Sequence, residues 1–194
     1  MDIVPAVATY LERVFDAARR TDTASFHRLA ERIEEAYVAG ATVFIVGNGG
    51  SAANASHLCE DLGKGTLTDF DGQRRLRVLS LTDNTPYLLA WGNDLSYEQV
   101  FVQQLRNLAS PGDLLLAISG SGNSPNVLRA VEYAKGHGVR TFAIGGFDGG
   151  RLHGLADDAL IVPCHDMGVV EAVHGIFLHL LVDVLRERFR GTPA

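Results

Sequence analysis

The sequence is poor in cysteine, carries no long basic run and has no apolar run long enough to cross a membrane. Its two cysteines, Cys59 and Cys164, are too few for a disulfide framework. The N-terminus lacks the basic stretch, apolar run and small-residue cleavage site of a secretory signal, and no apolar stretch reaches about 18 residues. We therefore expect a cytoplasmic protein that has no membrane partner.

Charge and motif content argue against two further classes. The 194-residue chain has a net charge of −6, and its longest basic cluster is Arg74, Arg75 and Arg77, so the electrostatic footprint of a nucleic-acid binder is missing. The segment "GKGT" at 63–66 has no glycine five residues before its lysine, as a Walker A loop requires. The glycines at 47–50 also lack the G-x-G-x-x-G spacing of dinucleotide sites. No nucleic-acid partner is expected, and neither nucleotide fingerprint is present.

Hydrophobic periodicity changes along the chain between helical and extended spacing. Apolar residues recur at helical intervals over residues 3–19 and 23–39, and Gly40 stands where a helix commonly ends. Beyond Gly40, short strand-like runs alternate with helical patterns. The strand-like runs begin at residues 41, 75, 113, 140 and 158, and the helical patterns cover about 51–62, 86–91, 97–109, 125–136 and 169–189.

Apolar strands that alternate with helices favour a parallel sheet covered on both faces, because crossover helices bury such strands. We predict an α/β fold: a three-layer αβα sandwich with a mainly parallel five-stranded sheet, an N-terminal helix pair and a long C-terminal helix. The length fits one domain. Residues 1–194 are therefore expected to form a single domain, with N-terminal helices at 1–40 and the α/β core and C-terminal helix at 41–194.

Two glycine- and serine-rich loops follow strand-like runs and open helices, which is where α/β sheets bind ligands. The first runs from Gly47 to Ser51, and the second from Ser119 to Pro125. Glycines let the backbone approach a ligand, and the free N–H groups of a helix start favour an anion. In the second loop Ser124 suits the N-cap and Pro125 the first helical position. One such loop could be only a turn, but two at equivalent strand ends indicate a phosphate site.

Four stretches together resemble the sugar isomerase (SIS) domain family, and within it the phosphoheptose isomerases. They are "VGNGGSAANASH" at 46–57, "GND" at 92–94, "ISGSGNSPNVLRA" at 118–130 and "EAVHGIFLH" at 171–179. The resemblance covers nearly the whole chain. It implies the SIS fold, a small-molecule sugar phosphate as partner, and a homotetramer in which the helices at 1–40 serve packing and oligomerisation.

The resemblance also implies roles for particular positions. In the family, serines of both loops hold the phosphate and polar groups face the sugar. A divalent metal, usually zinc, lies among a His and a Glu on the first helix of the core and a Gln and a His on the last. Here the metal positions are His57, Asp61, Glu171 and His179, so the two histidines match and the other two residues differ. The phosphate- and substrate-binding positions are Asn48, Gly49, Gly50, Ser51, Asp94, Ser119, Gly120, Ser121, Ser124 and Glu171.

Residue spacing supports part of this metal set. His57 and Asp61 are four apart, so they project from one face of a helix that begins at the first loop. Glu171 and His179 are eight apart, and eight helical residues rise about 12 Å, too far for both to reach one metal. Either Glu171 lies in an irregular start of the last helix, or a second subunit contributes. The sequence leaves both alternatives open.

The reaction implied by the resemblance is aldose–ketose isomerisation through an enediolate, with Asp61 as base and His179 as acid. Asp in place of Glu shortens the reach by one methylene, and a misplacement of about 1 Å can cost a hundredfold in rate. The alternative is a non-catalytic SIS module that senses a phosphosugar or binds a partner such as a replication initiator. Two departures favour this alternative: Asp61 replaces the usual Glu, and Gly120 stands where the isomerases usually have threonine. The retained histidines favour the enzyme.

Overall fold

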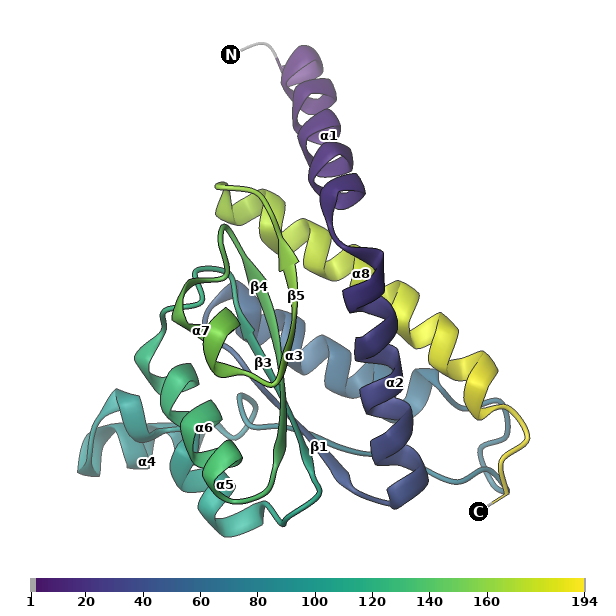
Figure 1. The fold of residues 1–194 in the computed structure, drawn as a ribbon, viewed down its shortest axis with the longest axis vertical. Coiled ribbons are helices and arrows are strands. Elements are labelled where there is room, and N and C mark those ends of the chain that lie inside the picture. The colour runs from purple at the N-terminus through teal and green to yellow at the C-terminus, as the bar shows by residue number, and fades with distance from the viewer. Residues whose placement is uncertain (1–2, 194) are drawn as a thin grey trace.

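The protein, described over residues 3–193 by a computed structural model, is a three-layer α/β sandwich (Figure 1). One sheet of five strands, all parallel, has the order β2-β1-β3-β4-β5. The predicted fold class is confirmed. The strands are β1 Thr42–Val46, β2 Arg77–Ser80, β3 Leu114–Ser119, β4 Arg140–Gly146 and β5 Asp158–Val162.

Helices cover both faces of the sheet. Within residues 3–193 they are α1 Ile3–Arg20, α2 Thr23–Ala39, α3 Gly50–Glu60, α4 Thr85–Asp94, α5 Val102–Leu108, α6 Pro125–Gly136, α7 Gly150–Leu155 and α8 Met167–Phe189. A π-helical turn, Asp61–Gly65, extends α3, and a 3-10 turn, Tyr97–Gln99, precedes α5, so the helix predicted at 97–109 is interrupted. The short α7 was not predicted, because six residues are too few to show a helical period.

Alternate residues of the central strands point into two different cores. Val43 and Ile45 of β1 pack with α2, α3 and α8, whereas Phe44 and Val46 pack with α5 and α6 on the opposite face. This alternation follows from the two-residue period of a strand. Because both faces are covered, these strands are apolar throughout, as the sequence pattern indicated.

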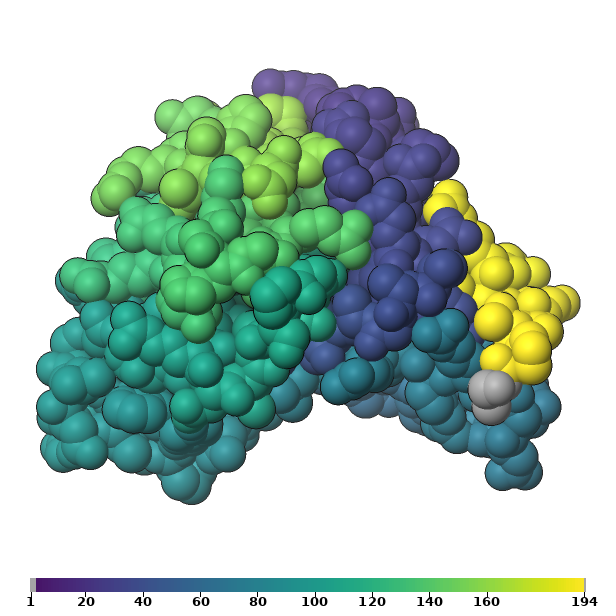
Figure 2. Space-filling model, turned by 60° about the horizontal axis from the view of Figure 1, so that its bottom comes forward, coloured from purple at the N-terminus to yellow at the C-terminus, as the bar shows by residue number. Residues whose placement is uncertain are grey.

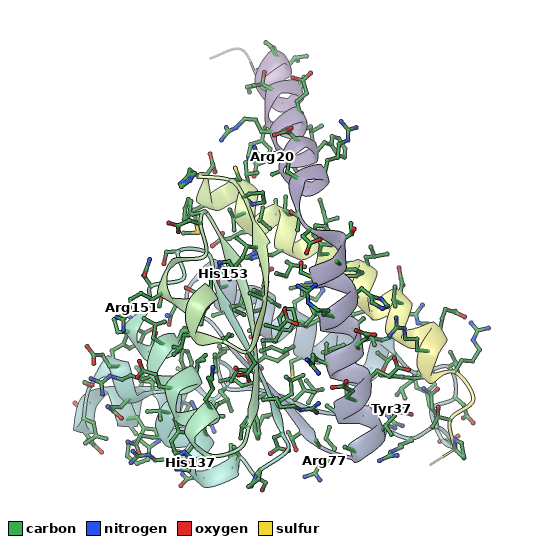
Figure 3. The ribbon with its side chains drawn as sticks, in the orientation of Figure 1. Arg20, Tyr37, Arg77, His137, Arg151 and His153 are labelled. Carbon is green, nitrogen blue, oxygen red and sulfur yellow. The ribbon has the colours of Figure 1, made fainter. Side chains whose placement is uncertain are left out.

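The long helix α8 belongs to the core. It is the one helix in the described part of the chain whose length and apolar composition would also suit a membrane span. However, ten of its residues are buried in the protein. Near its end Phe189 stacks on Tyr37 of α2 with ring centroids 3.9 Å apart, at the end of the molecule opposite α1 (Figure 3).

Helix α1 extends beyond the sandwich, and the residues that it buries lie in its C-terminal half (Figure 1). Val14 and Ala17 are its buried residues, and Arg13 pairs with Asp166 at the start of α8. Seen from below, α1 and α2 form a continuous purple-to-blue surface band (Figure 2). Large apolar side chains stand exposed on α1: Ile3, Val4, Val7, Tyr10, Leu11 and Phe15.

Candidate functional site

The two predicted loops lie side by side at the carboxyl ends of neighbouring strands. β1 and β3 pair directly, so the first loop follows β1 next to the second loop after β3. The side-chain amides of Asn48 and Asn126 join the loops, each donating a hydrogen bond to the other's oxygen at distances of 2.8 and 2.9 Å. Asn126 is buried. The loops therefore open onto one shared surface.

The first loop leaves the start of α3 without a side-chain cap. Gly49 occupies the N-cap position with φ +54°, a conformation that favours glycine, and no side chain accepts a hydrogen bond from the first turn. Ser51 follows in that turn and is buried. The uncapped N–H groups and the positive end of the helix dipole can bind an anion.

The second loop keeps its hydroxyls near one another. Ser124 has the extended backbone of an N-cap and Pro125 is at the helix start, as predicted. The Ser124 side chain makes no cap hydrogen bond; its Oγ lies 3.5 Å from Oγ of Ser119. Helix α7 supports the loop from behind, because Leu152 N donates to Gly122 O at 2.9 Å. Two loop hydroxyls are therefore not committed to capping α6.

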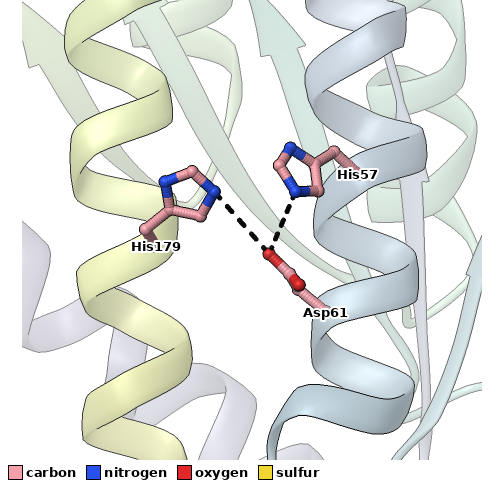
Figure 4. Close-up of side chains that lie close together, drawn as sticks. All are labelled: His57, Asp61 and His179. Carbon is pink, nitrogen blue, oxygen red and sulfur yellow. Dashed lines mark ion pairs between the residues drawn. The ribbon is translucent and has the colours of Figure 1, made fainter.

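His57, Asp61 and His179 form a cluster between α3 and α8 (Figure 4). One carboxylate oxygen of Asp61 lies 3.4 Å from Nε2 of His57 and 3.9 Å from Nε2 of His179. The two imidazole rings meet edge to face with centroids 4.9 Å apart. The histidine side chains are 56% and 62% exposed and that of Asp61 is 25% exposed. The cluster is thus open to solvent in a single chain.

The geometry of this cluster fits a divalent metal such as zinc. Its three ligand atoms lie within 4.8 Å of one another, and tetrahedral zinc holds N and O ligands roughly 3.3 Å apart at bond lengths of about 2.0–2.1 Å. Small side-chain rotations would close the difference. Three protein ligands with an open fourth position are typical of catalytic zinc sites.

Glu171 lies apart from this cluster within one chain. Helices α3 and α8 run in the same direction, since Asn54 binds the carbonyl of Glu171 at one end of their contact and Arg186 binds that of Gly65 at the other. A Cβ on Gly50 would lie 2.3 Å from Oε1 of Glu171, so the carboxylate stands over the start of α3. α8 is helical from Met167 onward, which excludes the irregular start. Its role as a metal ligand stays a prediction that requires a second subunit.

Asp94 is exposed at the end of α4 and accepts a hydrogen bond from Asn93 at 2.9 Å. The residue that reaches the loops from this segment is Tyr97, whose hydroxyl donates to Oδ1 of Asn48 at 2.8 Å. Sequence reasoning missed Tyr97, Asn126 and Asn54 as site residues. Asn126 could have been noticed, since it lies in the first turn of the helix that follows the second loop.

Two other ionisable residues near the site are neutral for reasons of burial. His174 is fully buried on α8, with Nε2 2.9 Å from Gly145 O, and desolvation lowers its pKa to about 4. Burial likewise raises the pKa of the Cys59 thiol, whose sulfur accepts a hydrogen bond from Ser80 N. A neutral thiol is a poor metal ligand, so Cys59 serves as a packing residue beside the core.

The sequence pattern of the SIS domain matches residues 8–146, so the fold and the site define an SIS domain protein. Phosphoheptose isomerase of Helicobacter pylori (strain Shi470) is 38% identical over 92% of this chain and 90% of its own length. Solved phosphoheptose isomerases from Neisseria gonorrhoeae and Francisella tularensis superpose with TM-scores of 0.85 and 0.89, at 28% and 26% identity. They cover 95% and 96% of this chain, and 97% and 100% of their own. The chain belongs to the phosphoheptose isomerase family of SIS domain proteins.

Proposed function

We propose that the protein is an aldose–ketose isomerase that interconverts sedoheptulose 7-phosphate and D-glycero-D-manno-heptose 7-phosphate. Its family membership supports the reaction class. The observation that carries the proposal is the reciprocal amide pair of Asn48 and Asn126. This pair holds the two anion-binding loops together at the start of α3, the helix that carries His57 and continues into the turn with Asp61.

The residues of the site divide into a phosphate end and a reacting end. Backbone N–H groups of the first loop and the hydroxyls of Ser51, Ser119, Ser121 and Ser124 hold the phosphate, while Asn48 and Asp94 are proposed to face the sugar. Asp61 takes the proton from the carbon that is being isomerised. His179, whose Nε2 lies 3.9 Å from Asp61, handles protons at the sugar oxygens as the acid.

A divalent metal, proposed to be zinc, would be held by His57, Asp61 and His179. It would supply positive charge that stabilises the developing oxyanion. Asp61 has two carboxylate oxygens, so one can ligate while the other accepts a proton. Glu171 is proposed to complete the ligand set or to contact the substrate from a second subunit.

The protein is proposed to be a cytoplasmic homotetramer, and the exposed apolar face of α1 supports self-association. Val7 and Leu11 are 52% and 47% exposed one helical turn apart, and a second copy of the chain would cover them. We expect Val7→Glu with Leu11→Glu to dissociate the assembly, as measured by light scattering. Arg19→Glu, farther along α1, is the control. A mutant that keeps its mass would contradict this use of α1.

The proposal is tested by sedoheptulose 7-phosphate turnover and zinc content of the purified protein, before and after chelation. Ser121→Ala should raise KM about tenfold, since it removes a hydrogen bond to a charged group. Ser110→Ala, in the turn before β3 at the amino-terminal end of the strands, should leave KM unchanged. Bound zinc with turnover that chelation abolishes supports the proposal.

A second candidate function, phosphosugar sensing without catalysis, is favoured by the openness of the cluster. General acid–base chemistry gains strength where water is excluded, yet both histidines are more than half exposed in one chain. Phosphosugar binding without metal and without turnover would identify a sensor. Metal without turnover would point to another phosphosugar substrate.

A further inference from the structure

The first two turns of α8 lie directly on glycines of three strand-end segments. A Cβ on Gly120 would stand 2.4 Å from Sδ of Met167, and one on Gly146 would stand 2.5 Å from Cγ1 of Val170. The Gly50 contact with Glu171 described above is the third. Residues 167, 170 and 171 share one face of the helix. This face of α8 can approach the loops only because side chains are absent beneath it.

The contact between Met167 and Gly120 differs from the other two. Gly120 lies within the second loop, between Ser119 and Ser121, and its φ is outside the positive range that favours glycine. The backbone therefore does not require glycine at 120, and a Cβ there would have to displace the flexible end of the Met167 side chain. Val170 is buried, whereas Met167 remains 41% exposed. Its side chain thus borders the open side of the loop instead of filling the core.

We propose that Met167 is a specificity-determining residue, whose thioether replaces a side chain at position 120 and forms an apolar wall beside the phosphate-binding serines. This inference rests on the proposed function. The side chains that residues 119–124 of the loop offer are three hydroxyls and one amide. A flexible thioether packs against apolar carbon and donates no hydrogen bond. In a sugar with a terminal phosphate, the carbon next to the phosphate ester is a methylene, and this is the group that Met167 contacts.

The test uses three variants of the full-length protein: Met167→Ala, Gly120→Ala and the double variant. Met167→Ala should raise KM for sedoheptulose 7-phosphate about tenfold, the effect of losing one apolar contact, with kcat within about twofold. Gly120→Ala should raise KM similarly, because its Cβ displaces the Met167 sulfur. In the double variant the two effects should not add, since both changes act on the same space.

Inhibition by inorganic phosphate distinguishes two explanations for a raised KM: loss of an apolar contact with the methylene, and distortion of the phosphate-binding loop. It has no methylene, so its inhibition constant should be the same in the wild type and in Met167→Ala. Leu108→Ala, 46% exposed on α5, and Gly136→Ala, with nothing within 4 Å of the new Cβ, are matched controls whose KM should not change. Thermal unfolding confirms that each variant is folded.

Four results would overturn the inference. If Met167→Ala left KM unchanged while Ser121→Ala raised it, the role of Met167 would be refuted and the proposed function would stand. A parallel loss of inorganic phosphate binding, or full additivity in the double variant, would show that Met167 acts through the loop backbone. A wild type that neither binds nor isomerises the phosphosugar would refute the proposed function and this inference with it.

Discussion

Two regions along the contact between α3 and α8 differ in burial and chemistry; the region next to the loops is called the closed end here, and the region around the histidine cluster the open end. At the closed end the helices meet the glycine-rich loops, Gly50 lies under the Glu171 carboxylate and His174 is fully buried. At the open end His57 and His179 stand more than half exposed around Asp61. One pair of helices thus carries a closed end and an open end about two helical turns apart.

The difference shows that two histidines on the same helix can have different roles. His174 and His179 are five residues apart on α8, yet only His179 faces a carboxylate. His174 binds a strand carbonyl with Nε2. We therefore expect changes at the open end to alter the rate of the chemical step, and changes at the closed end to alter stability and phosphate binding.

Asp61→Asn at the open end should produce the largest effect. It removes the proposed base, so kcat should fall about a thousandfold, within the usual range for general base catalysis. The free energy of unfolding should change little because the side chain is partly exposed. Asp61→Glu keeps the carboxylate and should retain most of the activity. Glu60→Gln, one residue away and 56% exposed, is the control. A fall of kcat below tenfold in Asp61→Asn would rule Asp61 out as the base.

His174 at the closed end predicts a pH dependence of stability. Its folded pKa of about 4 lies below the ordinary 6.5, so the unfolded chain binds the proton more readily between these values. Stability is therefore fully present above about pH 6.5 and is lost as the pH falls toward 4, by about 3 kcal/mol in total. Urea unfolding at several pH values above about 5 measures it, because aspartates and glutamates, with ordinary pKa values of about 3.9 and 4.3, are then mostly ionised.

Replacement of two histidines separates this effect from other titrations. In His174→Gln the free energy of unfolding should fall less steeply with decreasing pH, by a slope that corresponds to about one proton, because glutamine has no titrating group. His153→Gln, exposed on α7, should leave the decline unchanged. An equal decline in both variants would contradict the assignment to His174.

Asn126 joins the two loops to each other, so its loss should have an intermediate effect. Asn126→Ala leaves the amide of Asn48 and the N–H of Val127 without a partner, which costs about 1–3 kcal/mol of stability. KM should rise about tenfold as the loops separate. Asn126→Asp still accepts two of these hydrogen bonds and should be milder. Asn107→Ala on α5 is the control. A normal KM in Asn126→Ala would mean that the loops are held together by other contacts.

The sequence predicted the sheet, the helix pair and both loops, because glycine punctuation and apolar periodicity are local signals. It also placed His57 and Asp61 on one helix face. The contacts between α3 and α8 could not be predicted from residue spacing, because they depend on the parallel packing of the two helices. This packing brings His179 to Asp61 and leaves Glu171 at Gly50. The glycine at 120 was interpreted as a departure from the family, and the Met167 sulfur that a Cβ there would meet lies 47 residues away in the chain.

Tyr97→Phe should give the smallest effect of the series. The hydroxyl of Tyr97 donates to Asn48 Oδ1, but the amide of Asn126 donates to the same oxygen. Loss of one of two donors from an exposed tyrosine is worth less than about 1 kcal/mol, so KM should rise about two- to fivefold. Tyr133→Phe on α6 controls for the loss of a hydroxyl. If Tyr97→Phe raised KM as much as Asn126→Ala, Tyr97 would have to contact the substrate itself, and the segment after Asp94 would form part of the sugar site.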